Sequence, residues 1–299
     1  MEYKCGYIAI LGRPNAGKST LVNNLVGEKV AIVSPKPQTT RNNILGILTK
    51  DNYQLVLVDT PGIHKSKNAL DKYMMKNVRS AIGGADVNVY LFDCTKNIRD
   101  DEFDYIKKLA EEQTPLVVVI SKIDLKKYEE VLPLMMRLSE IQGIDDIVPI
   151  SSLRHKNTDE LVKVILNHLP SSEYKNFEFP EDEYTDKSLR FIVSETIREK
   201  ALYLLQQEIP HGINVDIVKF EEKKTLVSIE ADIICERETH KSIIIGKSGS
   251  MLKKIGEGAR NELEQLLQTK VFLKLFVKTK KNWREDVGLV NKFGYKPES

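Results

Sequence analysis

Residues 12–19 form the pattern that most constrains the fold of this chain. They read Gly-Arg-Pro-Asn-Ala-Gly-Lys-Ser, which fits G-x-x-x-x-G-K-S, and they lie between the apolar run 7–11 and the helix-favouring segment 20–26. Glycines let a backbone wrap closely around an anion, so that successive N–H groups and the start of a following helix point at phosphate oxygens. This strand–loop–helix context predicts a triphosphate-binding loop in an α/β fold.

The side chains of this loop have distinct expected roles. We expect the Lys18 ammonium to reach the β- and γ-phosphates and the Ser19 hydroxyl to bind Mg²⁺. The other loop residues expected at the phosphates are Gly12, Asn15, Ala16, Gly17 and Thr20.

Apolar runs and helical patterns alternate over the first part of the chain. Runs at 7–11, 55–58, 87–92, 116–120 and 147–150 are typical of buried parallel strands. Helical patterns separate them, at about 18–27, 68–82, 100–112, 127–141 and 157–168. This alternation predicts a doubly wound, mostly parallel α/β sheet that binds its ligand at the carboxyl ends of the strands.

A second, smaller α+β domain is expected after an acidic, Ser- and Pro-containing linker. We assign the first domain to 1–170, the linker to 171–187 and the second domain to 188–299. The second domain is predicted to begin with a long helix at about 189–207, followed by strands at 213–220 and 225–234. A glycine turn, a helix at about 250–268 and a last strand at 271–277 complete it.

Composition excludes several classes of protein. The 299 residues carry a net charge of +2, and their longest apolar runs are far too short for a membrane span. No secretory signal is visible, and the three separated cysteines fit neither a disulfide framework nor a metal cluster. These features predict a cytoplasmic protein with reduced thiols and no transmembrane segment.

Two later strand ends indicate which nucleotide is bound. The first is Asp59-Thr60-Pro61-Gly62, where a carboxylate can hold Mg²⁺ through water and the Gly62 N–H can meet the γ-phosphate. The second is Ser121-Lys122-Ile123-Asp124, where a carboxylate can accept two hydrogen bonds from guanine and the Lys stem can cover the base. Adenine lacks that donor pair, so the sequence favours GTP and GDP over adenine nucleotides. Backbone N–H groups of Ser151, Ser152 and Leu153 are expected at the guanine carbonyl.

The order of these elements resembles the translation-factor class of GTPases. Thr39 and Thr40 lie where that class keeps its first switch, and we favour Thr40 over Thr39 as the Mg²⁺ ligand that senses the γ-phosphate. Loss of the γ-phosphate would release this loop and the one that includes Ile63.

Four residues depart from or modify that pattern. Ser121 stands where Asn is usual, which predicts loss of a tie to the phosphate loop and weaker base binding. Ser152 replaces an Ala, which we expect to be mild because backbone donors recognise the base. Ile63 stands where Ras-like enzymes place a water-orienting Gln, so we expect a low intrinsic rate. Asn15 has two open interpretations: a K⁺ ligand, or a loop residue that makes a local turn bond.

The second domain carries a basic segment around a glycine turn. From Lys241 to Lys281 the chain has ten basic and three acidic residues, a local charge of +7, which on charge alone fits a polyanion partner and a solvated helix face equally. Inside it, Gly246-Lys247-Ser248-Gly249 opens a helix after Ile245 and matches the G-x-x-G loop of KH domains, which clamp single-stranded RNA. Lys253 and Lys254 are further expected RNA contacts. Trp283 could stack on a base or pack within the domain, and packing is favoured.

Over essentially its whole length the chain resembles the Era family of bacterial GTPases. The resemblance lies in 12–19, in Pro37-Gln38-Thr39-Thr40-Arg41, in 59–62, in Ile197-Arg198-Glu199-Lys200 and in 280–284, while Ser121, Ser152 and Arg154-His155-Lys156 depart from it. It implies a P-loop GTPase followed by a type II KH domain, with GTP/GDP and Mg²⁺ as ligands, and K⁺ as well if Asn15 is its ligand. It further implies binding near the 3′ end of 16S-type small-subunit rRNA, assistance in 30S assembly and a peripheral membrane pool. We expect the protein to be a monomer.

Two other functions remain open at this point. The first is an RNA-binding assembly scaffold whose nucleotide pocket is weak or largely structural. The second is a membrane-associated switch of the septin or dynamin type, which the lack of a lipid-anchor motif or a strongly amphipathic basic terminus disfavours.

Overall fold

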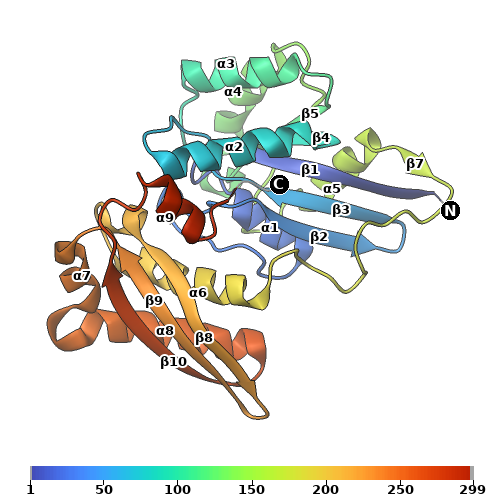
Figure 1. Cartoon of the computed structure of the whole chain (residues 1–299). Helices are drawn as coiled ribbons and strands as arrows, with labels where there is room; N and C mark the ends of the chain where they lie inside the picture. Colours follow the sequence, from blue (N-terminus) through green and yellow to red (C-terminus); the bar gives the residue numbers. More distant parts are fainter. Residues whose placement is uncertain (1, 297–299) are drawn as a thin grey trace. The chain divides into compact units, whose positions relative to one another are not determined.

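The computed structural model describes residues 2–296 and divides them into two compact units (Figure 1). The first unit holds the residues up to Ala31 together with Thr40–His64 and Met75–Asp186. The second holds Ile32–Thr39, Lys65–Met74 and the residues from Lys187 onward. Two short segments from the N-terminal part of the sequence thus fold with the C-terminal part.

A mostly parallel sheet forms the centre of the first unit. Its strand order is β2-β3-β1-β4-β5-β6, with the short β7 paired antiparallel to β1 and β2 antiparallel to β3. The strands are β1 (Tyr3–Gly12), β2 (Ile44–Lys50), β3 (Tyr53–Asp59), β4 (Val87–Asp93), β5 (Leu116–Ser121), β6 (Asp146–Pro149) and β7 (Ser171–Ser172).

Helices cover both faces of this sheet because its central strands are apolar on both sides. Along β1, Ile8 and Ile10 pack into one buried cluster, whereas Ala9 and Leu11 pack into the other. The first cluster takes residues from α1 and α5, and the second from α2, α3 and α4. These helices are α1 (Lys18–Val26), α2 (Ala69–Gly83), α3 (Asp100–Ala110), α4 (Tyr128–Ser139) and α5 (Thr158–His168), with a short 3₁₀ turn η1 (Ile123–Leu125) after β5.

The second unit packs helices against a three-stranded sheet. The order is β10-β9-β8, with β10 parallel and β8 antiparallel to β9. Val193, Ile197 and Ala201 of α6 and Ile255 and Ala259 of α8 recur at intervals of four and fill one buried cluster. The elements are α6 (Leu189–Leu204), η2 (Ile209–Gly212), β8 (Asn214–Lys223), β9 (Leu226–Cys235), α7 (Glu238–Ile245), η3 (Lys247–Gly249), α8 (Ser250–Leu267), β10 (Lys270–Thr279) and α9 (Val287–Lys292).

The predicted fold class, a doubly wound α/β domain followed by a smaller α+β domain, is confirmed. Two details differ. The sequence-based prediction contained no strand at Ile44–Lys50, and it extended the first helix of the second unit to about residue 207, whereas α6 ends at Leu204. The missed strand β2 is short and contains Gly46, at which a Cβ atom would lie 2.5 Å from Val22 of α1. Close packing rather than strand propensity therefore explains that glycine.

Candidate functional site

The loop after β1 has the backbone that its glycines predicted. Gly12 and Gly17 have φ angles of 140° and 102°, where side chains are disfavoured. A Cβ atom on Gly12 would lie 2.5 Å from the Leu91 carbonyl oxygen. Ala16 is buried, and Thr20 lies in the first turn of α1. The loop therefore holds its N–H groups in a fixed, tightly packed turn before the helix.

Lys18 lies inside this loop. Its side chain is buried, and its Nζ donates to the carbonyl oxygens of Gly12 and Arg13, both at 3.1 Å. Burial lowers the pKa of Lys18 to about 8, and the Asp59 carboxylate acts in the opposite direction. An anion bound in the loop would stabilise the charged ammonium.

Three oxygen-bearing side chains meet beside the loop. The Ser19 hydroxyl donates to Asp59 Oδ2 at 2.6 Å, and Thr40 Oγ1 lies 2.9 Å from Ser19 Oγ and 3.3 Å from Asp59 Oδ2. Asp59 has no solvent exposure, and its second carboxylate oxygen, Oδ1, is buried with no hydrogen-bond partner. Burial raises the pKa of Asp59 to about 6, although nearby Lys18 lowers it. Two hydroxyls and an unsatisfied carboxylate are the hard oxygen donors that suit Mg²⁺.

The structure brings Thr40, and not Thr39, to this group. The Thr39 hydroxyl instead donates to the Lys36 carbonyl oxygen at 2.7 Å. The sequence had favoured Thr40, and its position beside Ser19 and Asp59 agrees with that preference.

The residues after Asp59 are fixed by packing. The buried Thr60 hydroxyl donates to the Ile10 carbonyl oxygen at 2.7 Å. Pro61 is also buried, and a Cβ atom on Gly62 would lie 2.6 Å from the Pro14 backbone nitrogen. The Ile63 N–H donates to the Gly12 carbonyl oxygen at 3.0 Å, and its side chain packs against a buried apolar cluster. Ile63 therefore offers no polar group to a water molecule.

Ser121 corrects one expectation from the sequence. Its buried hydroxyl donates to the Ala16 carbonyl oxygen at 2.7 Å and also lies 3.1 Å from the Phe92 carbonyl oxygen. The predicted loss of the tie between this strand end and the phosphate loop is therefore wrong. A serine hydroxyl is shorter than an asparagine amide, but here the loop carbonyl lies close enough for it to reach.

Lys122 and Asp124 are positioned by polar partners. Lys122 Nζ forms an ion pair with Asp93 Oδ2 at 2.7 Å and donates to the Asn15 carbonyl oxygen at 2.7 Å. The Ser151 hydroxyl donates to Asp124 Oδ1 at 2.5 Å, while Asp124 itself is exposed. Sequence reasoning did not include Asp93, although its place at the carboxyl end of β4 was a usable signal.

The loop after β6 contains Ser151, Ser152 and Leu153. The Asn24 amide donates to the Ser152 carbonyl oxygen at 2.9 Å and contacts His155, whereas Leu153 is exposed. His155 has a φ of 51°, in the left-handed region that glycine adopts more easily. His155 lies in the stretch 154–156 that departs from the family pattern, and its left-handed backbone carries a conformational cost for a residue with a side chain.

Asn15 lies exposed at the tip of the loop. Its φ is 66°, and its carbonyl oxygen accepts the hydrogen bond from Lys122. These contacts hold the Asn15 backbone in place and leave both interpretations of its side chain open.

The glycine turn of the second unit joins α7 to α8. Gly246 has a φ of 73°, Ser248 of 50° and Gly249 of 80°. A Cβ atom on Gly246 would lie 2.8 Å from Met251, whereas nothing lies within 4 Å of one on Gly249. Lys247 and Ser248 lie between the two glycines, and Ile245, which precedes the turn, is half-buried. The turn thus presents backbone at the start of α8 with open space beside Gly249.

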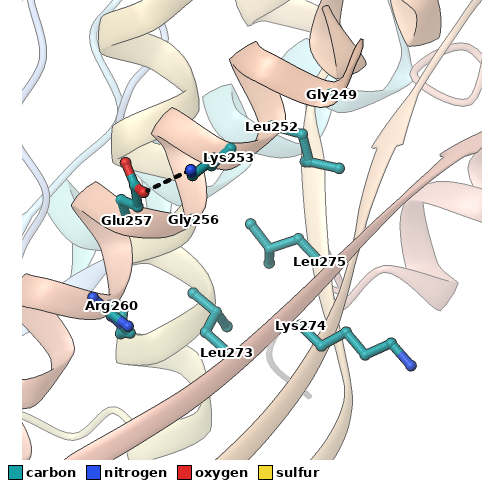
Figure 2. A pocket seen from close by; sticks show the side chains of 9 residues that line it. All are labelled: Gly249, Leu252, Lys253, Gly256, Glu257, Arg260, Leu273, Lys274 and Leu275. Atoms are coloured by element: carbon teal, nitrogen blue, oxygen red, sulfur yellow. Dashed lines mark ion pairs between the residues drawn. The ribbon is translucent and has the colours of Figure 1, made fainter.

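A groove with a volume of about 420 Å³ runs from this turn along α8 and β10 (Figure 2). Figure 2 shows Leu273 and Leu275 pointing toward α8 and Lys274 pointing away. The groove has an apolar floor and basic residues at its edges, and its lining is Gly249, Leu252, Lys253, Gly256, Glu257, Arg260, Leu273, Lys274 and Leu275. Of the residues expected to contact RNA, Gly249 and Lys253 line it, whereas Ile245, Gly246, Lys247, Ser248 and Lys254 do not. The sequence-based prediction counted Arg260 and Lys274 only as charge, because it did not pair β10 with α8.

Trp283 packs within the second unit. It is fully buried, its Nε1–H donates to the Gly212 carbonyl oxygen at 2.9 Å, and its ring stacks on Tyr295 at a centroid distance of 6.0 Å. The favoured interpretation of Trp283 as a packing residue agrees with this position.

Two kinds of feature are absent from residues 2–296. No cluster of three or more His, Cys, Asp or Glu side chains could hold a metal ion. No helix in that range has the length and apolar character needed to cross a bilayer.

Comparisons with known proteins agree along nearly the whole chain. The family described as 50S ribosome-binding GTPase matches residues 7–122, and the KH domain family matches residues 208–284. GTPase Era of Clostridium kluyveri is 48% identical over 296 residues, covering 98% of this chain and 99% of that protein. GTPase Era of Clostridium botulinum is 45% identical over 295 residues, with 98% and 99% covered.

Two solved structures share the fold. One is Era in complex with MgGDPNP and nucleotides 1506-1542 of 16S ribosomal RNA, with a TM-score of 0.93, 41% identity, and coverage of 98% of this chain and 99% of that one. The other is a single-residue variant of Aquifex aeolicus Era bound to GDP.AlF4-, with a TM-score of 0.93, 40% identity and the same coverage. A GTPase domain and a KH domain in this order, at this identity and coverage, leave one assignment: the chain belongs to the Era family of GTPases.

Proposed function

We propose that this GTPase is a molecular switch that binds small-subunit ribosomal RNA and assists assembly of the 30S subunit. One observation carries the proposal: buried Asp59, with an unsatisfied carboxylate oxygen, lies beside the Ser19 and Thr40 hydroxyls in a chain that also contains a basic groove beside a G-x-x-G turn. The first feature suits a nucleotide–metal complex, and the second suits a single-stranded polyanion.

In the nucleotide site, the backbone N–H groups of residues 12–20 would hold the phosphates and Lys18 would neutralise the β- and γ-oxygens. Ser19 and Thr40 would bind the metal directly, and Asp59 would hold one of its waters. When bound, Mg²⁺ supplies positive charge that stabilises the transferring phosphoryl group. Thr39, Thr60, Pro61, Gly62 and Ile63 complete the two switch segments in this assignment.

Guanine recognition is assigned to the loops after β5 and β6. Asp124 would accept the two guanine donors, and its hydrogen bond from Ser151 would orient it for that task. Ser121 would hold this strand end against the phosphate loop, Lys122 would cover the base, and Ser152 and Leu153 would present backbone donors. This tie weakens the case for a scaffold with a defective pocket, because that interpretation depended on Ser121.

Hydrolysis needs an ordering group other than Ile63. We propose that K⁺, held in part by Asn15, supplies positive charge near the β- and γ-phosphates. The intrinsic rate would accordingly be low, and K⁺ or RNA would raise it.

The RNA partner is proposed from a relative and from the groove. One solved relative is in complex with MgGDPNP and with nucleotides 1506-1542 of 16S ribosomal RNA. Here the turn residues Gly246–Gly249 would clamp the sugar-phosphate backbone, and Lys253 and Lys254 would add charge. The apolar floor at Leu252 and Leu275 would receive unpaired bases.

The wider context is also proposed. We assign the GTPase module to residues 1–170, the connecting segment to 171–187 and the KH module to 188–299. We propose a monomeric, cytoplasmic protein that acts on the 30S subunit and has a peripheral membrane pool.

The experiment is GTP turnover by the full chain in K⁺ or Na⁺, each with and without an RNA of the 16S 3′ end. We expect slow turnover in Na⁺ and at least a several-fold increase in K⁺, in RNA or in both. Absence of turnover under all four conditions would contradict the switch and favour the scaffold.

A further inference from the structure

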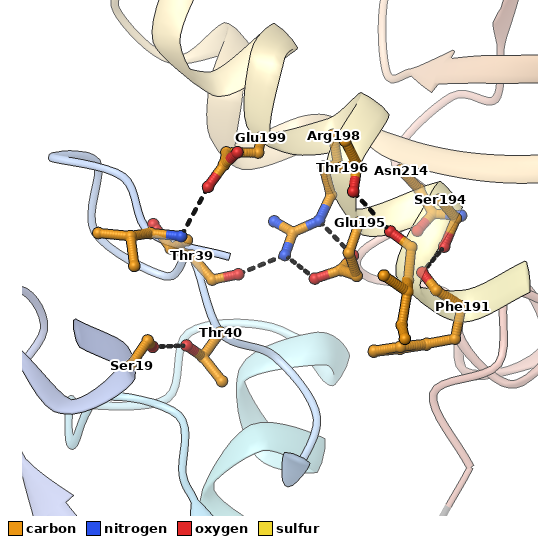
Figure 3. Close-up of polar contacts among 12 residues, drawn as sticks. Ser19, Thr39, Thr40, Phe191, Ser194, Glu195, Thr196, Arg198, Glu199 and Asn214 are labelled. Carbon is orange, nitrogen blue, oxygen red and sulfur yellow. Dashed lines mark hydrogen bonds and ion pairs between the residues drawn. The ribbon is translucent and has the colours of Figure 1, made fainter. Parts of the chain in front are cut away.

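The segment Ile32–Thr39, which precedes Thr40, folds within the second unit and is held there by two consecutive residues of α6. Arg198 donates to the Thr39 carbonyl oxygen, and Glu199 Oε1 accepts the Val33 N–H at 2.8 Å (Figure 3). Hydrogen bonds at both ends of an eight-residue segment restrict the paths that its backbone can take.

Arg198 is an unusual residue to find in this position. It is only 1% exposed, and its guanidinium forms two hydrogen bonds with Glu195, from Nε at 2.7 Å and from Nη2 at 2.6 Å. This bidentate pairing one helical turn away fixes the plane of the guanidinium. Its Nη1 is buried without a hydrogen-bond partner, so Arg198 is not optimally placed for stability alone.

Glu199 is anchored from the opposite direction. It is also buried, and Lys200 pairs both with Glu199, at 3.3 Å, and with Glu262 of α8. The two residues that hold the segment are thus themselves held by charged partners on α6 and α8. The sequence did not reveal the ion pairs of Arg198 and Glu199. In the sequence analysis, residues 197–200 were only part of a family resemblance.

A single peptide bond joins the Thr39 carbonyl to Thr40. Because that peptide is planar, the direction of the Thr39 carbonyl determines the direction of the Thr40 N–H and the position of the Thr40 Cα. Thr40 Oγ1 lies 2.9 Å from Ser19 Oγ, in the group that suits Mg²⁺ (Figure 3). The orientation imposed on Thr39 therefore continues directly into a proposed metal ligand.

We infer that Arg198, oriented by Glu195, is a positioning residue for Thr40 and selects the triphosphate-bound arrangement of the first switch. The inference rests on the proposed role of Thr40 at the metal and γ-phosphate. Arg198 touches neither substrate nor metal; it acts by fixing the Thr39–Thr40 peptide. Because only the triphosphate state engages Thr40, loss of Arg198 lowers the affinity for GTP more than the affinity for GDP.

The test compares the affinity of the full-length chain for a non-hydrolysable GTP analogue and for GDP, at several Mg²⁺ concentrations. In Arg198→Gln we expect the affinity for the GTP analogue to fall about tenfold, with GDP affinity within about twofold of the unaltered chain, because only the triphosphate state uses Thr40. The Mg²⁺ concentration for half-maximal analogue binding should rise, and kcat for GTP should fall more than KM changes. Equal loss of both affinities, or loss of neither, would overturn the inference.

Three further variants keep the test decisive. Arg198→Lys retains charge without the planar fork, so it should recover only part of the analogue affinity. Glu195→Gln keeps Arg198 but weakens its orientation, so its affinity for the GTP analogue should lie between those of Arg198→Lys and Arg198→Gln. This variant tests the inference even if Arg198→Gln does not fold. Glu262→Gln alters the same charged network through Lys200 without touching the segment and serves as the matched control; an effect on the analogue equal to that of Arg198→Gln would also overturn the inference. If the unaltered chain binds both nucleotides but never hydrolyses GTP, the proposed function fails while this affinity difference remains measurable.

Discussion

The proposed nucleotide site and the groove between α8 and β10, the proposed RNA site, differ in how much of each is fixed before a ligand arrives. Asp59, Thr60 and Ser121 are buried and hydrogen-bonded to neighbouring strands and loops. Along the groove, Lys253 and Arg260 are exposed. Lys253 makes a long ion pair with Glu257, at 3.8 Å, which holds its side chain weakly. A small ligand with defined charges binds best when each donor has a fixed position. A flexible polyanion can instead be bound by a positive electrostatic potential and an apolar surface.

This difference predicts how substitutions act at the two sites. A change in the nucleotide site removes a contact that no neighbour can replace, so its effect should be large and specific. A change at one groove lysine should be small, because the remaining basic residues keep the potential. The variants below test that contrast, from the largest expected effect to the smallest.

Lys18→Ala should have the largest effect. It removes the only ammonium within residues 12–19 and should lower GTP affinity by at least about 100-fold, since charge-assisted contacts to phosphate are strong. Equilibrium binding of a fluorescent GTP analogue measures this. An affinity close to that of the unaltered chain would refute the assignment of the phosphate loop.

Asp124→Asn should change which nucleotide is bound. The amide oxygen can still accept the Ser151 hydroxyl, while the new NH₂ faces a donor of guanine and suits the xanthine carbonyl instead. We expect at least about a tenfold loss of preference for GTP over XTP, measured by competition. Ser151→Ala, which removes only the orienting bond, should keep the preference for guanine and weaken binding a few-fold.

Gly249→Asp should separate the two sites. Its φ of 80° disfavours a side chain, and the carboxylate would repel a phosphate, so RNA affinity should fall about tenfold. GTP turnover without RNA should stay unchanged. Gly249→Ala introduces the backbone strain without the charge and should have a smaller effect, since nothing lies within 4 Å of its Cβ. Equal losses of RNA binding and basal turnover in Gly249→Asp would indicate misfolding rather than a site.

Ser121→Ala should have a smaller effect than Lys18→Ala or Asp124→Asn on nucleotide binding. It leaves the Ala16 carbonyl oxygen without its buried hydroxyl donor, a cost of about 1 kcal/mol, or roughly fivefold in affinity. Isothermal titration with GDP measures it. If affinity is unchanged, the Ser121 hydroxyl does not support the loop, and the sequence-based expectation of a weakened pocket regains force.

Local patterns selected the residues of the proposed nucleotide site because these residues lie in short motifs at strand ends. The alternation of apolar strands and helices predicted the sheet, and its topology brings residues 12–19, 59–62, 121–124 and 151–153 to one edge. The choice of Thr40 over Thr39 also agrees with the structure. These features follow from the order of residues along the sequence, so they can be predicted without knowledge of tertiary distances.

Features that depend on tertiary distance could not be predicted. The expected consequence of Ser121 was wrong because the distance from its hydroxyl to the Ala16 carbonyl is set by packing. Arg198 and Lys274 were not assigned roles in the sites, since nothing local indicates that α6 holds residues 32–39 or that β10 borders the groove beside α8. The strand β2 was also missed, although its apolar residues Ile44, Leu45, Ile47 and Leu48 were a usable local signal.

The most direct test of the switch is the affinity of the full chain for an RNA of the 16S 3′ end in two nucleotide states. Binding is measured at fixed salt with saturating GDP or a non-hydrolysable GTP analogue, and Gly249→Asp reports the contribution of the groove. We predict at least about a fivefold difference between the two states in the unaltered chain, and a difference that largely disappears in Gly249→Asp. Equal RNA affinities in the two states of the unaltered chain would contradict the account.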